Sequence, residues 1–220
     1  VKDSFIAFGT PPDDAQTCAE VLIASDLRGV ESHGVGRLRY YYDRLITGQH
    51  DVNTKIDIVR ESPTTAVLEG NHGLGMVIGK YAMNMAIEKA RTYGMGSVAV
   101  RNSTHFGIAG YYPTMAVAEG MVGFTFTNAR PSVCPTFGTM PILGTNPIAF
   151  AAPSDEPFPF LYDAATPIVQ RGLIEKLDRE EKSAKEGWLV DSQNNYLTEP
   201  DEIISALIKG EAAFLPLGGI

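Results

Sequence analysis

The stretch Ser97-Val98-Ala99-Val100-Arg101-Asn102-Ser103-Thr104-His105-Phe106-Gly107 joins a strand pattern to a polar turn that carries a histidine. The valines at its start favour a strand over 97–101, and a helical pattern follows at 109–119. Catalytic groups often follow a strand, because the sheet fixes the backbone while the loop exposes the side chain. His105 can donate and accept a proton near neutral pH. The alternative is a capping or core histidine.

A second histidine lies in Glu31-Ser32-His33-Gly34-Val35-Gly36-Arg37. Ser32 is a favourable N-cap, so a helix is expected to begin there, with His33 and Arg37 four residues apart on one face. A guanidinium can hold a carboxylate through two parallel hydrogen bonds, and His33 beside it can orient or protonate a carbonyl oxygen. The alternative is a capped helix with a surface arginine.

The chain has four histidines, and the other two indicate no chemistry. His72 lies in Gly70-Asn71-His72-Gly73-Leu74-Gly75, which lacks the third glycine and the acidic residue of a dinucleotide fingerprint. A turn that leads into the next helix is the favoured interpretation. His50 follows Gly48 in a loop after a helix and is expected to be solvated.

Helical and strand patterns alternate along the chain, which is typical of the mixed α/β class. Apolar spacing and Gly or Pro boundaries predict one helix that begins at Pro12 and ends before Gly29, and a second that begins at Ser32 and ends before Gly48. Further helices are predicted over 78–93, 109–119, 167–184 and 201–209. Strands are predicted over 55–60, 65–69, 97–101, 122–127, 147–152 and 158–162.

Composition excludes several functional classes. The net charge of −8 and the absence of a basic run argue against a nucleic-acid partner. No apolar run approaches the roughly 20 residues that span a bilayer, and no signal-peptide pattern opens the chain, so no membrane partner is expected. Two cysteines, Cys18 and Cys134, suggest thiols in a reducing cytoplasm. No metal is expected, because neither His-x-x-x-His nor Cys-x-x-Cys occurs.

Taken together, these motifs resemble the malate/L-lactate dehydrogenase family of the second type. That family includes ureidoglycolate, sulfolactate and 2,3-diketogulonate dehydrogenases and imine reductases of cyclic amino acids. The joint order and spacing of the matching segments are far more specific than any one motif. The matching segments are Asp26–Val35 with Arg37, Ala86–Arg91 with Gly94, Asn102–Gly107, Gly144–Pro147, Asp163–Thr166, Gly187–Trp188 and Leu215–Gly219.

The resemblance implies a family-specific, non-Rossmann nicotinamide-binding fold. It also implies hydride transfer between NAD or NADP and a small 2-hydroxy or 2-keto acid such as malate or lactate. The roles that it implies are catalysis by His105, His33 and Ser32, substrate binding by Arg37 and Asn146, and cofactor binding by Asn128, Ala129, Asp163, Ala164 and Ala165.

The expected organisation is an N-terminal helical segment, 1–60, that carries the Ser-His-Gly motif, and an α/β cofactor- and substrate-binding domain, 61–220. The chain begins in mid-pattern at Val1 and stops in a loop-like stretch, and the resemblance implies a further C-terminal part. We therefore expect a chain truncated at both ends. The resemblance also implies a homodimer. Two alternatives stay open, namely an NADPH-dependent imine reductase on a cyclic 2-carboxylate and an inactive truncated fragment.

Overall fold

The computed structural model describes residues 1–218, which form two compact units. The first unit contains residues 1–125 and 150–162, and the second contains residues 126–149 and those from 163 onward. The expected functional division at residue 60 stays a prediction.

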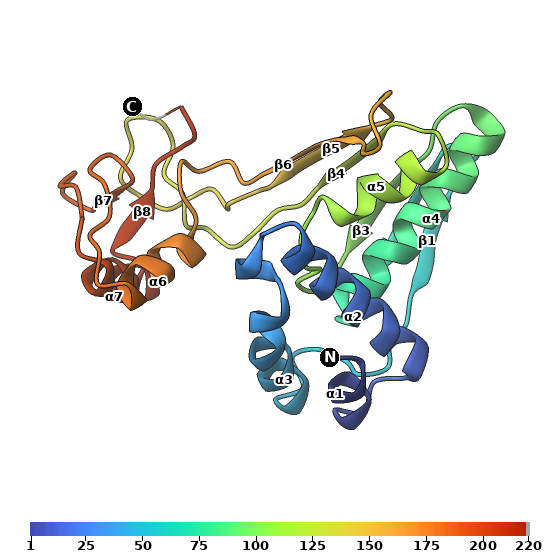
Figure 1. Cartoon of the computed structure of the whole chain (residues 1–220), viewed down its shortest axis with the longest axis horizontal. Helices are drawn as coiled ribbons and strands as arrows, with labels where there is room; N and C mark the ends of the chain where they lie inside the picture. The colour runs from blue at the N-terminus through green and yellow to red at the C-terminus, as the bar shows by residue number, and fades with distance from the viewer. Residues whose placement is uncertain (219–220) are drawn as a thin grey trace. The chain divides into compact units, whose positions relative to one another are not determined.

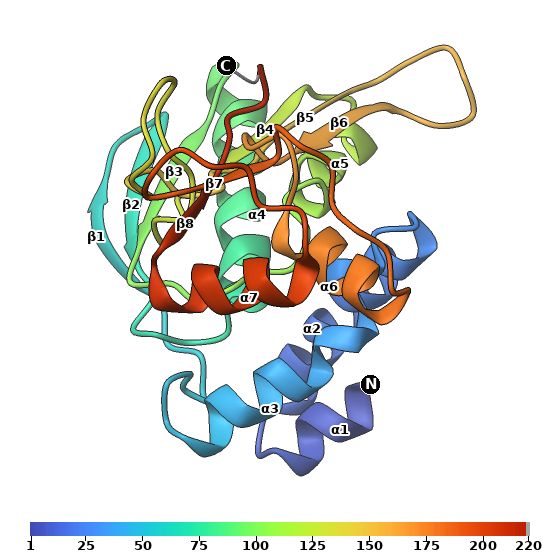
Figure 2. The same cartoon turned by 90° about the vertical axis from the view of Figure 1, so that its left-hand side faces the viewer.

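A three-stranded sheet and one long helix form the frame of the first unit. Strand β1 (Asp57–Glu61) pairs antiparallel with β2 (Thr65–Glu69), and β2 pairs parallel with β3 (Ser97–Arg101). Parallel neighbours require a long crossover connection, which α4 (Gly75–Tyr93) supplies while it packs against both strands (Figure 2). Gly94 ends α4 in the left-handed conformation. This arrangement brings the loops that follow β2 and β3 to the same edge of the sheet.

Four further helices and two short 3₁₀ turns complete the first unit. They are α1 (Lys2–Ala7), α2 (Pro12–Leu27), the turns η1 (Glu31–His33) and η2 (Val35–Arg37), α3 (Leu38–Ile46) and α5 (Tyr111–Ala118). Pro12 stands at the first position of α2, and two aspartates follow in its first turn, where the helix dipole favours negative charge.

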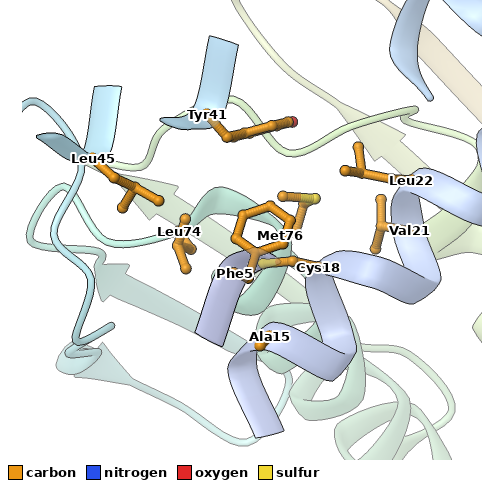
Figure 3. Packing of buried hydrophobic residues seen from close by; sticks show 9 residues of the cluster. All are labelled: Phe5, Ala15, Cys18, Val21, Leu22, Tyr41, Leu45, Leu74 and Met76. Atoms are coloured by element: carbon orange, nitrogen blue, oxygen red, sulfur yellow. The ribbon is translucent and has the colours of Figure 1, made fainter. Parts of the chain in front are cut away.

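The helices α1, α2 and α3 share one core with the start of α4 (Figure 3). The rings of Phe5 and Tyr41 lie 5.9 Å apart at its centre, and neither side chain is exposed. The other buried members are Ala15, Cys18, Val21, Leu22, Leu45, Leu74 and Met76. This core fixes the position of α3, which follows directly after the Ser-His-Gly motif.

A second three-stranded sheet has the order β4-β5-β6, formed by β4 (Gly123–Phe126), β5 (Ile148–Ala152) and β6 (Phe160–Ala164). The boundaries of the two compact units fall inside these three strands. The Phe150 ring lies 4.8 Å from Phe124 and 5.8 Å from Phe160, between ring centroids. These aromatic contacts across neighbouring strands stabilise the sheet.

The second unit is built on the short antiparallel pair β7 (Leu189–Asp191) and β8 (Ala212–Phe214). Two helices, α6 (Arg171–Arg179) and α7 (Pro200–Lys209), pack together beside this pair (Figure 1). The core of this unit contains the buried side chains of Val133, Val169, Ile174, Ala184, Leu189, Ile203 and Phe214.

The predicted mixed α/β class is confirmed. Within residues 1–218 no sheet has more than three strands, so the doubly wound sheet of the Rossmann fold is absent there. One expectation is wrong, because no helix begins at Ser32. The chain there forms 3₁₀ turns, and α3 begins at Leu38. Within the described residues no helix is long and apolar enough to cross a membrane.

Candidate active site

The loop that carries His105 is clamped to the loop that follows β2. The Gly70 amide donates to the Arg101 carbonyl over 2.9 Å, and the His72 amide donates to the Asn102 carbonyl over 2.8 Å. The Thr104 hydroxyl donates to the Gly73 carbonyl over 2.8 Å and accepts from the Gly75 amide over 2.9 Å. The backbone immediately before His105 is therefore fixed to the start of α4.

Glycine is required where the two loops meet. A side chain at Gly75 would overlap the backbone carbonyl oxygen of Thr104. The turn that leads into α4 thus serves as packing for the His105 loop, in agreement with the interpretation of the His72 stretch as a turn. His72 itself is exposed and has φ of 57°.

The segment that carries Ser32, His33 and Arg37 is held from α2. The Asp26 carboxylate accepts a hydrogen bond from the Val35 amide over 2.9 Å, and a side chain at Gly34 would overlap that carboxylate. The Ser32 hydroxyl lies 2.9 Å from His33 Nδ1, and Arg37 Nε donates to the Ser32 carbonyl over 2.6 Å. Arg37 therefore lies near His33 as predicted, although a pair of 3₁₀ turns and not one helix brings them together.

The structure brings the two predicted catalytic histidines face to face. The rings of His33 and His105 stack with their centroids 5.5 Å apart and an interplanar angle of 22°. Two α3 side chains also contact the His105 ring, with Tyr40 and Tyr41 each at 5.7 Å between centroids. The Tyr41 hydroxyl lies 2.6 Å from His105 Nδ1. The predicted pair is thus one cluster that α3 supports.

The surroundings of this cluster favour neutral imidazoles. Burial lowers the pKa of His105 to about 3, with the charges of His33, Arg37 and His50 adding to the effect. Burial together with the Arg37 charge lowers the pKa of His33 to about 4. Near neutral pH both rings are therefore uncharged in the free protein, and Arg37 supplies the positive charge.

Two members of the cluster are not predicted from the sequence. Periodicity places Tyr41 only on the apolar face of its helix, and no local pattern indicates the histidine 64 positions away that its hydroxyl meets. The expectation that His50 is solvated is wrong, because the residue is only 5% exposed and its ring lies 6.1 Å from Tyr40 and 6.2 Å from Tyr41. His50 Nδ1 is buried without a hydrogen-bond partner among the described residues.

The predicted cofactor residues and Asn146 all lie in the second compact unit. The Asn146 side-chain oxygen accepts a hydrogen bond from the Ala129 amide over 3.0 Å, which joins the Asn128–Ala129 segment to the Gly144-Thr145-Asn146-Pro147 motif. The Thr145 carbonyl accepts from both the amide and the hydroxyl of Thr166, over 2.9 and 3.0 Å, directly after Asp163-Ala164-Ala165. Three predicted segments are therefore neighbours within this unit.

Comparison with known proteins establishes the family of the chain. All residues, 1–220, match the family model described as malate/L-lactate dehydrogenase. The protein belongs to this family. The resemblance that the motifs indicated is therefore confirmed.

Relatives of known structure or activity are similar over the whole of this chain but extend beyond it. Malate dehydrogenase of Pyrococcus horikoshii is 47% identical over 211 residues, which cover 96% of this chain and 57% of the relative. L-sulfolactate dehydrogenase of Methanocaldococcus jannaschii is 43% identical over 219 residues, which cover 100% and 62%. The crystal structure of malate dehydrogenase from Entamoeba histolytica matches with a TM-score of 0.97 at 46% identity, covering 99% of this chain and 61% of that one. The chain thus spans about three fifths of these relatives.

More distant relatives are named for other substrates and for both nicotinamide cofactors. An NAD(+) ureidoglycolate dehydrogenase of Escherichia coli K12 is 30% identical over 200 residues, covering 91% of this chain and 57% of the relative. An NADP(+) (2R)-3-sulfolactate dehydrogenase of Chromohalobacter salexigens is 31% identical over 201 residues, covering 90% and 60%. The structure of Δ1-piperideine-2-carboxylate reductase from Pseudomonas syringae has a TM-score of 0.90 at 28% identity, covering 99% and 64%.

We predict that the free energy of unfolding decreases as the pH falls from about 6.5 toward 4. In that range the unfolded chain binds protons at His33, His50 and His105, whose pKa values are lowered in the folded protein. Burial and the Arg44 charge lower the pKa of His50 from 6.5 to about 4. Between pH 7 and pH 5 its share of the loss is about 1–2 kcal/mol.

Chemical denaturation of the protein at pH 7 and at pH 5 measures this loss. His50→Gln should reduce it by the share stated. His72→Asn is the matched control, because His72 is exposed and asparagine tolerates its positive φ. The same pH dependence in His50→Gln and the wild type would contradict the prediction.

Proposed function

We propose that the protein is an NAD- or NADP-dependent oxidoreductase that interconverts a small 2-hydroxy acid, such as malate or lactate, and the corresponding 2-keto acid. The observation that carries the proposal is the stacked His33–His105 pair with Arg37 beside it. A cation and a titratable group in one cluster match a substrate in which a carboxylate adjoins the carbon that reacts. Family membership supports the same class of reaction.

In this mechanism Arg37 binds the substrate carboxylate. Its guanidinium donates from Nε to the Ser32 carbonyl, which fixes the plane of the side chain and leaves the two terminal NH₂ groups for the ligand. His33, held by the Ser32 hydroxyl, orients the oxygen on C2. Because the substrate loses its translational and rotational freedom when it binds in this way, less entropy remains to be lost on reaching the transition state.

His105 transfers the proton in the proposed reaction. In reduction it donates a proton to the C2 oxygen as that carbon gains a hydride, and in oxidation it takes the proton back as the hydride leaves. The ring nitrogen that would act is Nε2, because Nδ1 is hydrogen-bonded to Tyr41. Because the ring is neutral in the free protein, each reductive cycle takes up one proton from water through His105, and each oxidative cycle releases one.

The residues proposed to hold the nicotinamide are Asn128, Ala129, Asp163, Ala164 and Ala165. They fit such a group: Asn128 and Asp163 are exposed polar residues that can bond amide and hydroxyl groups, while the alanines leave space for a flat ring. Asn146, bonded to the Ala129 amide, would shape the same region. When bound, the cofactor supplies or accepts the hydride.

A second candidate function is reduction of a cyclic imine that carries a 2-carboxylate, with NADPH. The similarity to a solved Δ1-piperideine-2-carboxylate reductase favours this candidate. The same residues would serve it, because a carboxylate adjoins the C=N carbon as it adjoins the C=O carbon.

The proposed assembly is a homodimer, and the proposed location is the cytoplasm, consistent with two buried free thiols.

The decisive test of the function is the oxidation of NADH and NADPH by the purified protein with a panel of 2-keto acids and one cyclic imine 2-carboxylate. We expect turnover with at least one 2-keto acid. Turnover with the imine alone would establish the second candidate in place of the first. A folded protein that turns over none of these substrates would contradict both.

Replacing His105 by Asn should reduce kcat by about 10²- to 10⁴-fold, because the group that donates and accepts the proton is lost. The substrate still binds through Arg37, so KM should change much less. His72→Asn should retain wild-type kcat, because His72 lies in the exposed turn before α4. Steady-state kinetics in the active direction measures both variants. Near-normal kcat in His105→Asn would remove His105 from the mechanism.

Replacing Arg37 by Met should raise KM for the acid by about 10- to 100-fold, which corresponds to the loss of a charge-assisted hydrogen-bonded pair. Arg39→Met is the matched control, since the Arg39 side chain is 80% exposed and pairs with Asp43 on the outside of α3. Substrate saturation curves at fixed cofactor concentration distinguish the two variants. If both have the same KM, Arg37 does not bind the carboxylate.

A further inference from the structure

Tyr41 is a buried residue whose hydroxyl group meets the proposed catalytic histidine. Its side chain is fully buried in the helical core, against Phe5 and with Leu22, Leu74 and Met76 around it (Figure 3). The hydroxyl oxygen lies 2.6 Å from His105 Nδ1. We propose that Tyr41 is a positioning residue that holds neutral His105 in the tautomer with its proton on Nε2, so that the ring offers a hydrogen-bond donor to the substrate. The inference rests on the proposed role of His105.

The assignment follows from an account of donors and acceptors. His105 Nδ1 is the one acceptor that the Tyr41 hydroxyl has within residues 1–218. If Nδ1 carried the proton, the buried hydroxyl would have to accept from it, and its own hydrogen would have no partner. A buried donor without an acceptor costs about 1–3 kcal/mol. Tyr41 therefore donates to Nδ1.

A second donor acts on the same nitrogen. The Gly107 amide also points at His105 Nδ1, over 3.3 Å. An amide nitrogen can only donate, so this contact too requires a lone pair on Nδ1. Gly107 has φ of 77°, and a side chain there would meet Val21, so the turn that aims this amide depends on glycine. Two donors from different segments thus converge on Nδ1, and in the neutral ring the proton stays on Nε2.

The other neighbours of His105 favour the neutral ring. The groups that face the His105 ring are His33 in η1, Arg37 in η2, His50 after α3, and Tyr40 and Tyr41 of α3. None of these groups is a carboxylate that could stabilise an imidazolium. In agreement with this, the pKa of His105 lies at about 3. Within the described residues Nε2 makes no hydrogen bond, so it is the ring nitrogen left for a ligand.

This tautomer has a consequence for the substrate. An Nε2–H group matches an oxygen or nitrogen that accepts, such as the carbonyl oxygen of a 2-keto acid or the nitrogen of an imine. A neutral imidazole can polarise such a bond as an electrophile. A hydroxyl that donates its proton would instead need a lone pair on Nε2. The free protein is therefore prepared for the oxidised substrate, and reduction begins from the resting tautomer.

The test that decides the tautomer is NMR of the ¹⁵N-histidine-labelled protein at neutral pH without substrate. The chain has four histidines, and the spectrum of His105→Asn identifies the signals of His105 by their loss. We expect the Nδ1 shift of an unprotonated nitrogen and the Nε2 shift of a protonated one. Protonated Nδ1 in the wild type would overturn the proposal. Because no turnover is involved, this result stands or falls independently of the proposed function.

Tyr41→Phe keeps the ring in the core and removes only the hydroxyl. In this variant the Nδ1 and Nε2 shifts of His105 should move toward each other as the two tautomers exchange. The rate constant kcat for reduction should fall about 10- to 100-fold with little change in KM. Tyr42→Phe, the matched control on the same helix, removes a hydroxyl from a ring that packs on Phe8 and should leave both readouts unchanged. An unchanged His105 spectrum in folded Tyr41→Phe would overturn the proposal. If Tyr41→Phe does not fold, the wild-type spectrum alone decides.

Discussion

The parallel pairing of β2 with β3 is the constraint on which the proposed site depends. Because the two strands run in register from Thr65 and Ser97 to Glu69 and Arg101, the loops after them leave the sheet at the same edge. The hydrogen bonds between those loops, and those of the Thr104 hydroxyl, then fix the backbone beside His105. The proposed catalytic histidine, although it lies on a loop, thereby gains the rigidity of a strand, which positioning at atomic precision requires.

The helical core supplies the second support. Tyr41 extends from α3 with its ring among apolar side chains and its hydroxyl on His105, so one residue belongs to the core and to the site. The His33 ring stacks on the His105 ring. The turn that carries His33 is held by the Asp26 carboxylate of α2. His33, Arg37 and His105 are half-buried, and the lower local dielectric strengthens the interaction of Arg37 with an anion. The same burial keeps the imidazoles neutral, which costs stability in acid.

Local pattern was sufficient for much of the fold and for the placement of His105 in the loop after a strand. Strands β2 and β3 occupy the predicted residues, because apolar β-formers flanked by turn residues leave few alternatives. The position of His105 after a strand was correct for the same reason. The order and spacing of the motifs together indicated the family, which no single motif could do. The helix predicted at Ser32 was wrong, because the Asp26 carboxylate binds the Val35 amide and tertiary structure overrides the capping preference.

What the sequence could not indicate depends on contacts between distant segments. The periodicity of α3 correctly marks Tyr41 as buried, but it is silent on which group meets the hydroxyl, and that group lies 64 positions away. A leucine would satisfy the apolar stripe equally well. A tyrosine at a buried position carries a polar group that must find a partner, so its presence is itself a signal. His50 is a weaker signal of the same kind, because a loop histidine near a helix end is ordinarily solvated. Its burial becomes evident only from the contacts of its ring with Tyr40 and Tyr41. A polar atom on an apolar stripe, close in sequence to a catalytic motif, is thus a reason to expect a hydrogen bond that supports the catalytic group.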